Sequence, residues 1–219
     1  MLVFMQSLVL AFGALLPVVN PLGSSLMFLG VVGAAPPDEF RQLARKVAFS
    51  TMLFLLVVEL AGATLLAFFG ISLPVVQLAG GLVLAAMGWQ LLNEKDLDTT
   101  SATPPAHRSR SHFRDKIFYP LTFPITAGPG CIVVTGTLSA HASRHAATQN
   151  VIAHFGIAAA IVALSLLVLL SYAYAPKITR AVAPQTVQGI LRVIAFILLC
   201  IGVQIGWKGL EALINTGLK

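Results

Sequence analysis

The sequence predicts an all-α membrane protein with six transmembrane helices, arranged as two inverted three-helix repeats in which the first helix of each repeat is broken. Three observations lead to this fold class. The chain is 57% hydrophobic and only 10% charged, which is typical of a polytopic helical membrane protein and not of a soluble domain. Its long apolar segments are separated by short polar stretches. Two Pro/Gly-rich motifs interrupt the first apolar segment of each half.

The two motifs are similar in composition. The first, Pro17–Gly23, reads PVVNPLG, and the second, Pro124–Gly130, reads PITAGPG. Each contains two prolines and ends in glycine, so continuous helical hydrogen bonding is not expected there. Hydrocarbon cannot satisfy the freed backbone groups, so such a break persists only inside protein or beside a polar cavity. Paired breaks in two halves indicate a transporter's substrate site, although the motifs could also serve only to kink their helices for packing.

The first half of the chain, residues 1–92, is expected to hold three spans. Residues 1–35 contain no acidic or basic side chain. As one helix they would extend about 50 Å, against about 30 Å of hydrocarbon, so two half-helices around the first motif are expected. The second span is Val47–Phe69, whose one charge is Glu59. The third is Ile71–Leu92, which follows a tight turn and is uncharged.

The second half, residues 116–219, follows a polar linker at residues 93–115. The linker contains Thr-Thr-Ser and Pro-Pro sequences and mixed charges, which predict a flexible connection. The second half is expected to hold the remaining three spans: Ile117–Ala140, about Val151–Tyr174 and about Val187–Ile214.

The order of features is the same in both halves, which predicts an internal repeat. A broken helix comes first, a plain helix second, and third a helix that carries Gly88-Trp89-Gln90 or Gly202-Val203-Gln204. The two motifs are 107 residues apart and the Gly-x-Gln sequences are 114 apart. Because each half holds an odd number of spans, the second half must insert upside down relative to the first.

Basic residues predict the orientation, because short cytoplasmic loops are enriched in Lys and Arg. The loops after spans one, three and five, with the entry to span six, hold eleven of the 14 Lys and Arg residues: Arg41, Arg45, Lys46, Lys95, Arg108, Arg110, Arg114, Lys116, Lys177, Arg180 and Arg192. The opposite side holds three: Arg144, Lys208 and Lys219. This asymmetry places the linker in the cytoplasm and both termini in the periplasm. The net charge of +6 therefore concerns topology, and no nucleic-acid partner is expected.

Three motifs in order resemble the MarC family of bacterial and archaeal integral membrane proteins. They are Asn20-Pro21-Leu22-Gly23, then Phe69-Gly70-Ile71-Ser72 with Leu78-Ala79-Gly80-Gly81, and the motif Pro124–Gly130. The resemblance covers nearly the whole chain. It implies six membrane helices, a place in the bacterial inner membrane, and transport of small neutral amino acids such as glycine and alanine, which some members are described as carrying.

The broken helices supply the candidate substrate site. At each break, one half-helix presents amide N–H groups and the other presents carbonyl groups, and a zwitterionic amino acid needs both. Asn20 adds an amide and Thr126 a hydroxyl, while small residues leave room for the backbone to approach a ligand. The expected substrate-binding residues are Asn20, Pro21, Gly23, Thr126, Ala127, Gly128, Pro129 and Gly130.

A few further polar residues lie in the spans. Glu59 is the only acidic residue deep within a span, and it is a candidate for carrying a coupling proton, or alternatively a structural carboxyl group bonded to neighbouring helices. Gln77, Gln90 and Gln204 are candidate polar lining residues, although such side chains more often bond between helices. His141 and His145 lack a third ligand, so no metal site is expected. No cofactor is expected either, beyond a coupling H+ or Na+.

These features favour a secondary transporter working by alternating access. The alternatives are an exporter of drugs or other small metabolites, or a channel. An enzyme is not expected, because no catalytic cluster or nucleotide-binding loop is present. The expected partners are a small neutral amino acid and the lipid bilayer, and an oligomer remains open.

Overall fold

The computed structural model describes residues 1–32, 36–93, 117–143, 147–177 and 184–217. Every regular element in these ranges is helical, which confirms the all-α class. The elements are α1 (Leu2–Val19), α2 (Pro21–Val32), α3 (Pro37–Phe68), α4 (Leu73–Asn93), η2 (Ile117–Thr126), α5 (Pro129–Ala142), α6 (Ala147–Ala173) and α8 (Pro184–Gly217). Apart from Asn93, the predicted linker lies outside the described residues.

The predicted number of membrane spans is confirmed only in part. Within the described ranges, 4 segments are long and apolar enough to cross a membrane: Leu2–Leu29, Leu73–Asn93, Thr148–Ala173 and Gln188–Asn215. The bent pair of η2 and α5 would bring the number up to 5 if it forms one span. The predicted second span lies in α3, a helix of 32 residues whose charged side chains, except Glu59, all fall in its first three turns.

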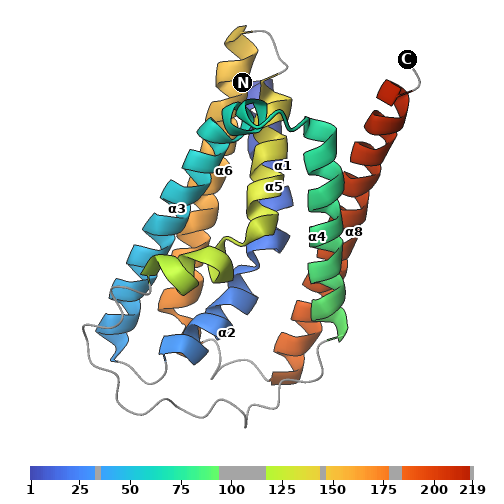
Figure 1. Cartoon of the computed structure of the whole chain (residues 1–219). Coiled ribbons are helices and arrows are strands. Elements are labelled where there is room, and N and C mark those ends of the chain that lie inside the picture. The colour runs from blue at the N-terminus through green and yellow to red at the C-terminus, as the bar shows by residue number, and fades with distance from the viewer. Residues whose placement is uncertain (33–35, 94–116, 144–146, 178–183, 218–219) are drawn as a thin grey trace.

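The chain passes back and forth along one long axis (Figure 1). α1 and α2 run from the N-terminal end of the molecule to the opposite end, α3 returns, and α4 runs back again. η2 lies across the front of the bundle, and α5, α6 and α8 complete the alternation. The N-terminus and the end of α8 therefore lie at the same end of the molecule.

The packing pairs equivalent elements of the two halves. α4 packs along α8, and α3 packs along α6. In addition, α6 packs against α1 and α2, while α3 packs against α5 and η2. Each half thus places its second helix against the broken helix of the other half.

Glycines bring α4 and α8 into backbone contact. A Cβ atom added at Gly88 would lie 2.6 Å from Leu199 N, and one added at Gly202 would lie 2.3 Å from Ala85 N. Small residues of this kind allow close helix packing in membranes. An offset of 114 residues relates the contact positions to one another: Gly81 to Ala195, Ala85 to Leu199, and Gly88 to Gly202. The offset predicted from the Gly-x-Gln sequences therefore recurs as a reciprocal contact.

The outer surface is apolar along the length of the bundle. Leu60 is 72% exposed, Phe155 67% and Trp207 65%. Large apolar side chains over so much of a surface are unfavourable in water and fit a lipid environment.

Candidate functional site: two helix breaks beside one cavity

The first break is confined to a single residue, Asn20, which joins α1 to α2. Asn20 has φ 44° and ψ 66°, in the left-handed region that asparagine tolerates better than most residues. Its backbone N–H donates to Leu16 O at 3.0 Å, closing α1. Its side-chain Oδ1 accepts from Gly23 N–H at 3.1 Å, which caps α2. The break is narrower than the sequence predicted.

The two prolines of the first motif both lie in helical backbone. Pro17 lies within α1, and Pro21 is the first residue of α2, where a missing N–H leaves no hydrogen bond unmade. Gly23 is needed for space, because a Cβ atom there would lie 2.4 Å from Asn20 Nδ2. The glycine thus lets the Asn20 amide lie against α2.

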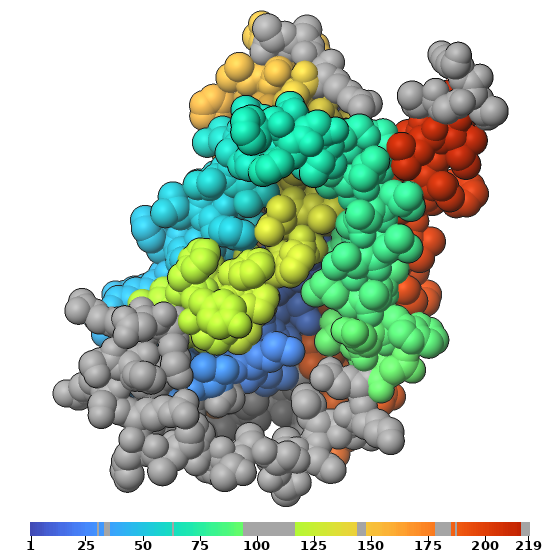
Figure 2. Space-filling view, viewed as in Figure 1, coloured from blue at the N-terminus to red at the C-terminus, as the bar shows by residue number. Residues whose placement is uncertain are grey.

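The second break is wider, and η2 and α5 meet at 69°. The expected regular half-helix before the break is wrong, because Tyr119 and Phe123 have non-helical backbone angles. Pro120 and Pro124 cannot donate a backbone hydrogen bond. Hydrogen bonds between residues five apart in the sequence close the segment instead. Ala127 N–H, for example, donates to Thr122 O at 2.8 Å. Figure 2 shows η2 at the surface between α3 and α4, next to α2.

Tyr172 of α6 connects the two breaks. Its hydroxyl lies 2.6 Å from Thr126 Oγ1, at the end of η2. Its ring stacks on Phe28 of α2, with 4.5 Å between ring centroids. Tyr172 is fully buried. Its identity as a link between the halves could not be read from the sequence, because nothing marks it apart from Tyr174 two residues later.

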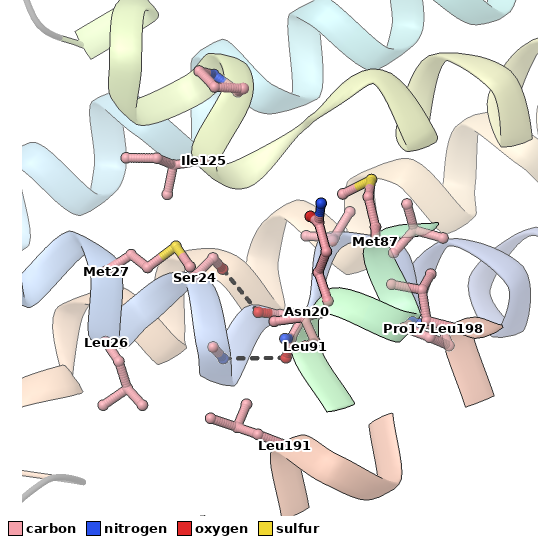
Figure 3. A pocket seen from close by; sticks show the side chains of 15 residues that line it. Pro17, Asn20, Ser24, Leu26, Met27, Met87, Leu91, Ile125, Leu191 and Leu198 are labelled. Carbon is pink, nitrogen blue, oxygen red and sulfur yellow. Dashed lines mark hydrogen bonds between the residues drawn. The ribbon is translucent and has the colours of Figure 1, made fainter. Parts of the chain in front are cut away.

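A cavity of about 530 Å³ lies beside both breaks. It is lined by the first motif and α2, by the last turns of α4, by the second motif and by α8: Pro17, Val18, Val19, Asn20, Gly23, Ser24, Leu26, Met27, Met87, Gln90, Leu91, Pro124, Ile125, Leu191 and Leu198. Figure 3 shows Asn20 with its two hydrogen-bonded neighbours on α2, and with Met87 and Leu91 of α4 on the other side. The polar side chains of this lining are Asn20, Ser24 and Gln90.

The structure places the predicted site residues in three groups. Asn20, Gly23 and Gln90 line the cavity. The other predicted residues of the two motifs do not: Pro21, Thr126, Ala127, Gly128 and Gly130 are buried in packing, and Pro129 is exposed. Gln77 and Gln204 also lie outside the lining. Sequence analysis missed Ser24 and the apolar lining from α4 and α8, whose residue types do not distinguish them from other membrane-span residues.

Gly130 has a packing role in this structure. A Cβ atom there would lie 2.5 Å from Leu84 Cδ2 and 3.1 Å from Val18 Cγ1. Gly80 of α4, which precedes Leu84 by about one helical turn, has a similar role, since its Cβ would lie 1.9 Å from Val133 Cγ1. These glycines therefore allow α4 and α5 to pack closely.

Glu59 lies away from the cavity, in a second polar cluster. Its side chain is 1% exposed and contacts Nδ1 of His154 on α6. His154 was missed by sequence analysis, because a single histidine in an apolar span gives no sign of its partner. Among the described residues no three His, Cys, Asp or Glu side chains form a metal-binding group. His145 lies outside them.

The fold and its surface define a polytopic α-helical integral membrane protein with two broken helices beside an internal cavity. Comparison with known proteins is consistent with this class. Over residues 5–214 the sequence matches the description "MarC family integral membrane protein", and the chain belongs to that family.

Relatives of similar length include "UPF0056 inner membrane protein MarC" from Escherichia coli strain K12 and from Shigella flexneri. Each is 30% identical to this chain over 221 residues, covering 99% of both sequences. No solved structure matches the chain. Membership confirms the family predicted from the motifs and places the chain among multi-pass inner-membrane proteins.

Proposed function

We propose that the protein is a secondary transporter of small neutral amino acids that works by alternating access between two inverted three-helix repeats. The observation that carries this proposal is the convergence of both Pro/Gly motifs on one cavity. Pro17–Asn20 and Gly23 come from the first half, and Pro124 and Ile125 come from the second motif, which begins 107 residues after the first. Paired helix breaks around a shared cavity are the arrangement found at the substrate sites of inverted-repeat transporters.

The chemistry of the first break suits a zwitterion. Residues of the last turn of α1 line the cavity, and the carbonyl groups at this helix end carry partial negative charge, which favours an ammonium group. The start of α2 carries partial positive charge, which favours a carboxylate. Since Asn20 Oδ1 already caps α2, the atom of this side chain left for a ligand is the Nδ2 donor. We assign Asn20 Nδ2 to the substrate carboxylate.

The asymmetry of the two repeats supports alternating access. The offsets that relate the halves carry the cavity residues Gly23, Gln90 and Leu198 onto Gly130, Gln204 and Leu84. In this structure Gly130 and Leu84 are packed together, so that the equivalent space is closed. A transporter that alternates would open this second space while the first closes. Gly130, Gln77 and Gln204 are then lining residues of the opposite state.

Basic residues support an inward-facing assignment. Of the six described Lys and Arg residues, Arg41, Arg45, Lys46, Lys177 and Arg192 fall where α3 begins, α6 ends and α8 begins, at one end of the bundle. The cavity includes the last turns of α4 and the second turn of α8, which lie toward this same end. The positive-inside rule makes it the cytoplasmic end, with both termini in the periplasm.

An exporter of larger, apolar compounds is the second candidate. The cavity volume lies within the range of about 300–1,000 Å³ typical of small-molecule sites and exceeds the needs of glycine. Met27 and Met87 line it, and methionine adapts to irregular apolar ligands.

A thermal-shift experiment tests the proposal and separates the two candidates. A ligand that binds only the folded state stabilises it by about 2.7 kcal/mol at 100 times its dissociation constant, so glycine or alanine should raise the melting temperature of purified protein. Asn20→Asp keeps the capping oxygen and removes the donor, and should abolish this shift without changing the ligand-free melting temperature. Stabilisation by apolar drugs, with none by any amino acid, would favour the exporter.

A further inference from the structure

A polar cluster distinct from the cavity lies where α3, α5 and α6 meet. It consists of Glu59 on α3, His154 on α6, and Ser143, which directly follows α5. Glu59 Oε1 contacts His154 Nδ1, and His154 Nε2 lies 3.3 Å from Ser143 Oγ. The His154 side chain is 24% exposed, whereas that of Glu59 is 1% exposed. The cluster therefore leads from an accessible imidazole to a buried carboxyl group.

The hydrogen bonds of the cluster accommodate one extra proton. Ser143 has one hydroxyl proton, and it donates that proton to Ser139 O at 3.0 Å. In that arrangement its oxygen accepts from His154, so that Nε2 carries a proton. The contact between Nδ1 and Oε1 needs another proton, held by one atom or the other. The pair thus carries one proton more than a carboxylate beside a neutral imidazole, and its net charge is zero.

Few other titratable side chains surround this pair in the described part of the chain. The titratable groups on the elements packed against α3 are few: Cys131 and His141 on α5, Tyr119 on η2 and Tyr172 on α6. His141 is exposed, and Tyr172 lies about 27 Å from His154 along α6. α1, which packs on α6, has no titratable side chain. Loss of the extra proton would therefore leave a negative charge on a buried group that no side chain of these described elements is seen to offset, which is unfavourable.

We propose that the Glu59–His154 pair is the proton-binding site of coupled transport, a step that rests on the transport function proposed above. A proton from the aqueous phase binds His154 Nε2 while the Nδ1 proton passes to the Glu59 carboxylate. The imidazole is then neutral and the carboxyl group is protonated. The resulting pair has the hydrogen bonds seen in this structure.

The position of α5 connects this pair to the second break. Ser139 Oγ donates to the backbone carbonyl of Glu59 at 2.6 Å, next to the carboxyl group that binds the proton. When the pair loses its proton and keeps the Nδ1–H bond to Glu59, Nε2 is left bare, and Ser143 must turn its hydroxyl from Ser139 to His154. The end of α5 then changes partners, while Gly130 at its start packs on Leu84.

Transport by purified protein in vesicles tests this site. Counterflow exchange of labelled glycine or alanine needs no net proton movement, whereas accumulation driven by a pH gradient does. Glu59→Gln and His154→Gln should retain counterflow and lose gradient-driven accumulation. Glu211→Gln, which alters an exposed acid on α8, should leave both unchanged. Infrared titration of the wild type should show one proton leaving a carboxyl or imidazole group, and Glu59→Gln should remove this signal.

Each opposite result has a separate meaning. Gradient-driven accumulation by Glu59→Gln, or accumulation in the wild type that follows only a Na+ gradient, would overturn the proton site and leave amino acid transport intact. A wild type that neither binds nor exchanges any amino acid would overturn the proposed function itself. If Glu59→Gln does not fold, His154→Gln and the wild-type infrared titration decide, and a wild type without a titrating signal overturns the site.

Discussion

Removal of the Tyr172 hydroxyl should loosen the connection between the two helix breaks. In Tyr172→Phe the ring can keep its stacking on Phe28, so only hydrogen bonding changes. Thr126 Oγ1 donates its one proton to Leu121 O at 2.6 Å. Tyr172 must therefore donate to Thr126, and the substitution removes an accepted bond while leaving no buried donor unpaired.

The magnitude follows from hydrogen bonds measured between membrane helices, which contribute about 0.6 kcal/mol on average and up to about 1.7 kcal/mol. Because Tyr172 and Thr126 are at most 1% exposed and 2.6 Å apart, we expect a loss near the upper value. Thr126→Val should cost at least as much, since it also removes the bond to Leu121. The double variant should be less destabilised than the sum, by about 0.5–1 kcal/mol.

Reversible unfolding in mixed detergent micelles measures these free energies. Tyr174→Phe is the matched control, because Tyr174 is exposed and directly follows the same helix, and its change should stay within about 0.5 kcal/mol. Strictly additive losses for Tyr172→Phe and Thr126→Val would refute the hydrogen bond as the link between the breaks.

Three further predictions concern packing, topology and access. Gly88→Ala should destabilise the protein by about 1–3 kcal/mol, because its Cβ meets the α8 backbone. Gly13→Ala should not destabilise it, because nothing lies within 4 Å of the added atom. Equal unfolding free energies for the two variants would contradict the close contact. A C-terminal reporter should be periplasmic, and a cysteine at Thr100 should label only from the cytoplasm; a cytoplasmic C-terminus would overturn the charge argument. With Cys131 and Cys200 replaced, Gln90→Cys should react with a maleimide from the cytoplasmic side and be protected by substrate, and reaction from the periplasmic side alone would reverse the assigned orientation.

Features that depend on local sequence, such as segment length and motif order, could be predicted. Apolar segment length predicted a helical membrane protein, and motif order predicted the family. The first motif predicted a helix break, and the break falls at Asn20, because an asparagine can both adopt left-handed backbone and cap the next helix. The Gly-x-Gln sequences predicted an offset that the α4–α8 contact repeats.

The features that depend on contacts between distant segments could not be predicted. His154 and Tyr172 gain their importance only from Glu59 and Thr126, which lie 95 and 46 residues away. The exact extent of each break could not be predicted either. A proline disfavours continuous helix, but it does not determine which neighbouring residue adopts the non-helical backbone. Pro17 and Pro21 flank a break of one residue, whereas Pro120 and Pro124 lie inside an irregular segment of ten.

Gly23 and Gly130, which hold matching positions in the two motifs, have different surroundings in this structure. Gly23 and Gly130 end matching motifs, yet one lines a cavity and the other fills a helix contact. If the motifs served only to kink helices, both glycines should have the same surroundings. A protein that alternates between two states must instead be asymmetric in each of them, because the two spaces cannot be open together. The closed packing of Gly130 on Leu84 is therefore what the transport proposal requires of a structure whose open side is at Gly23.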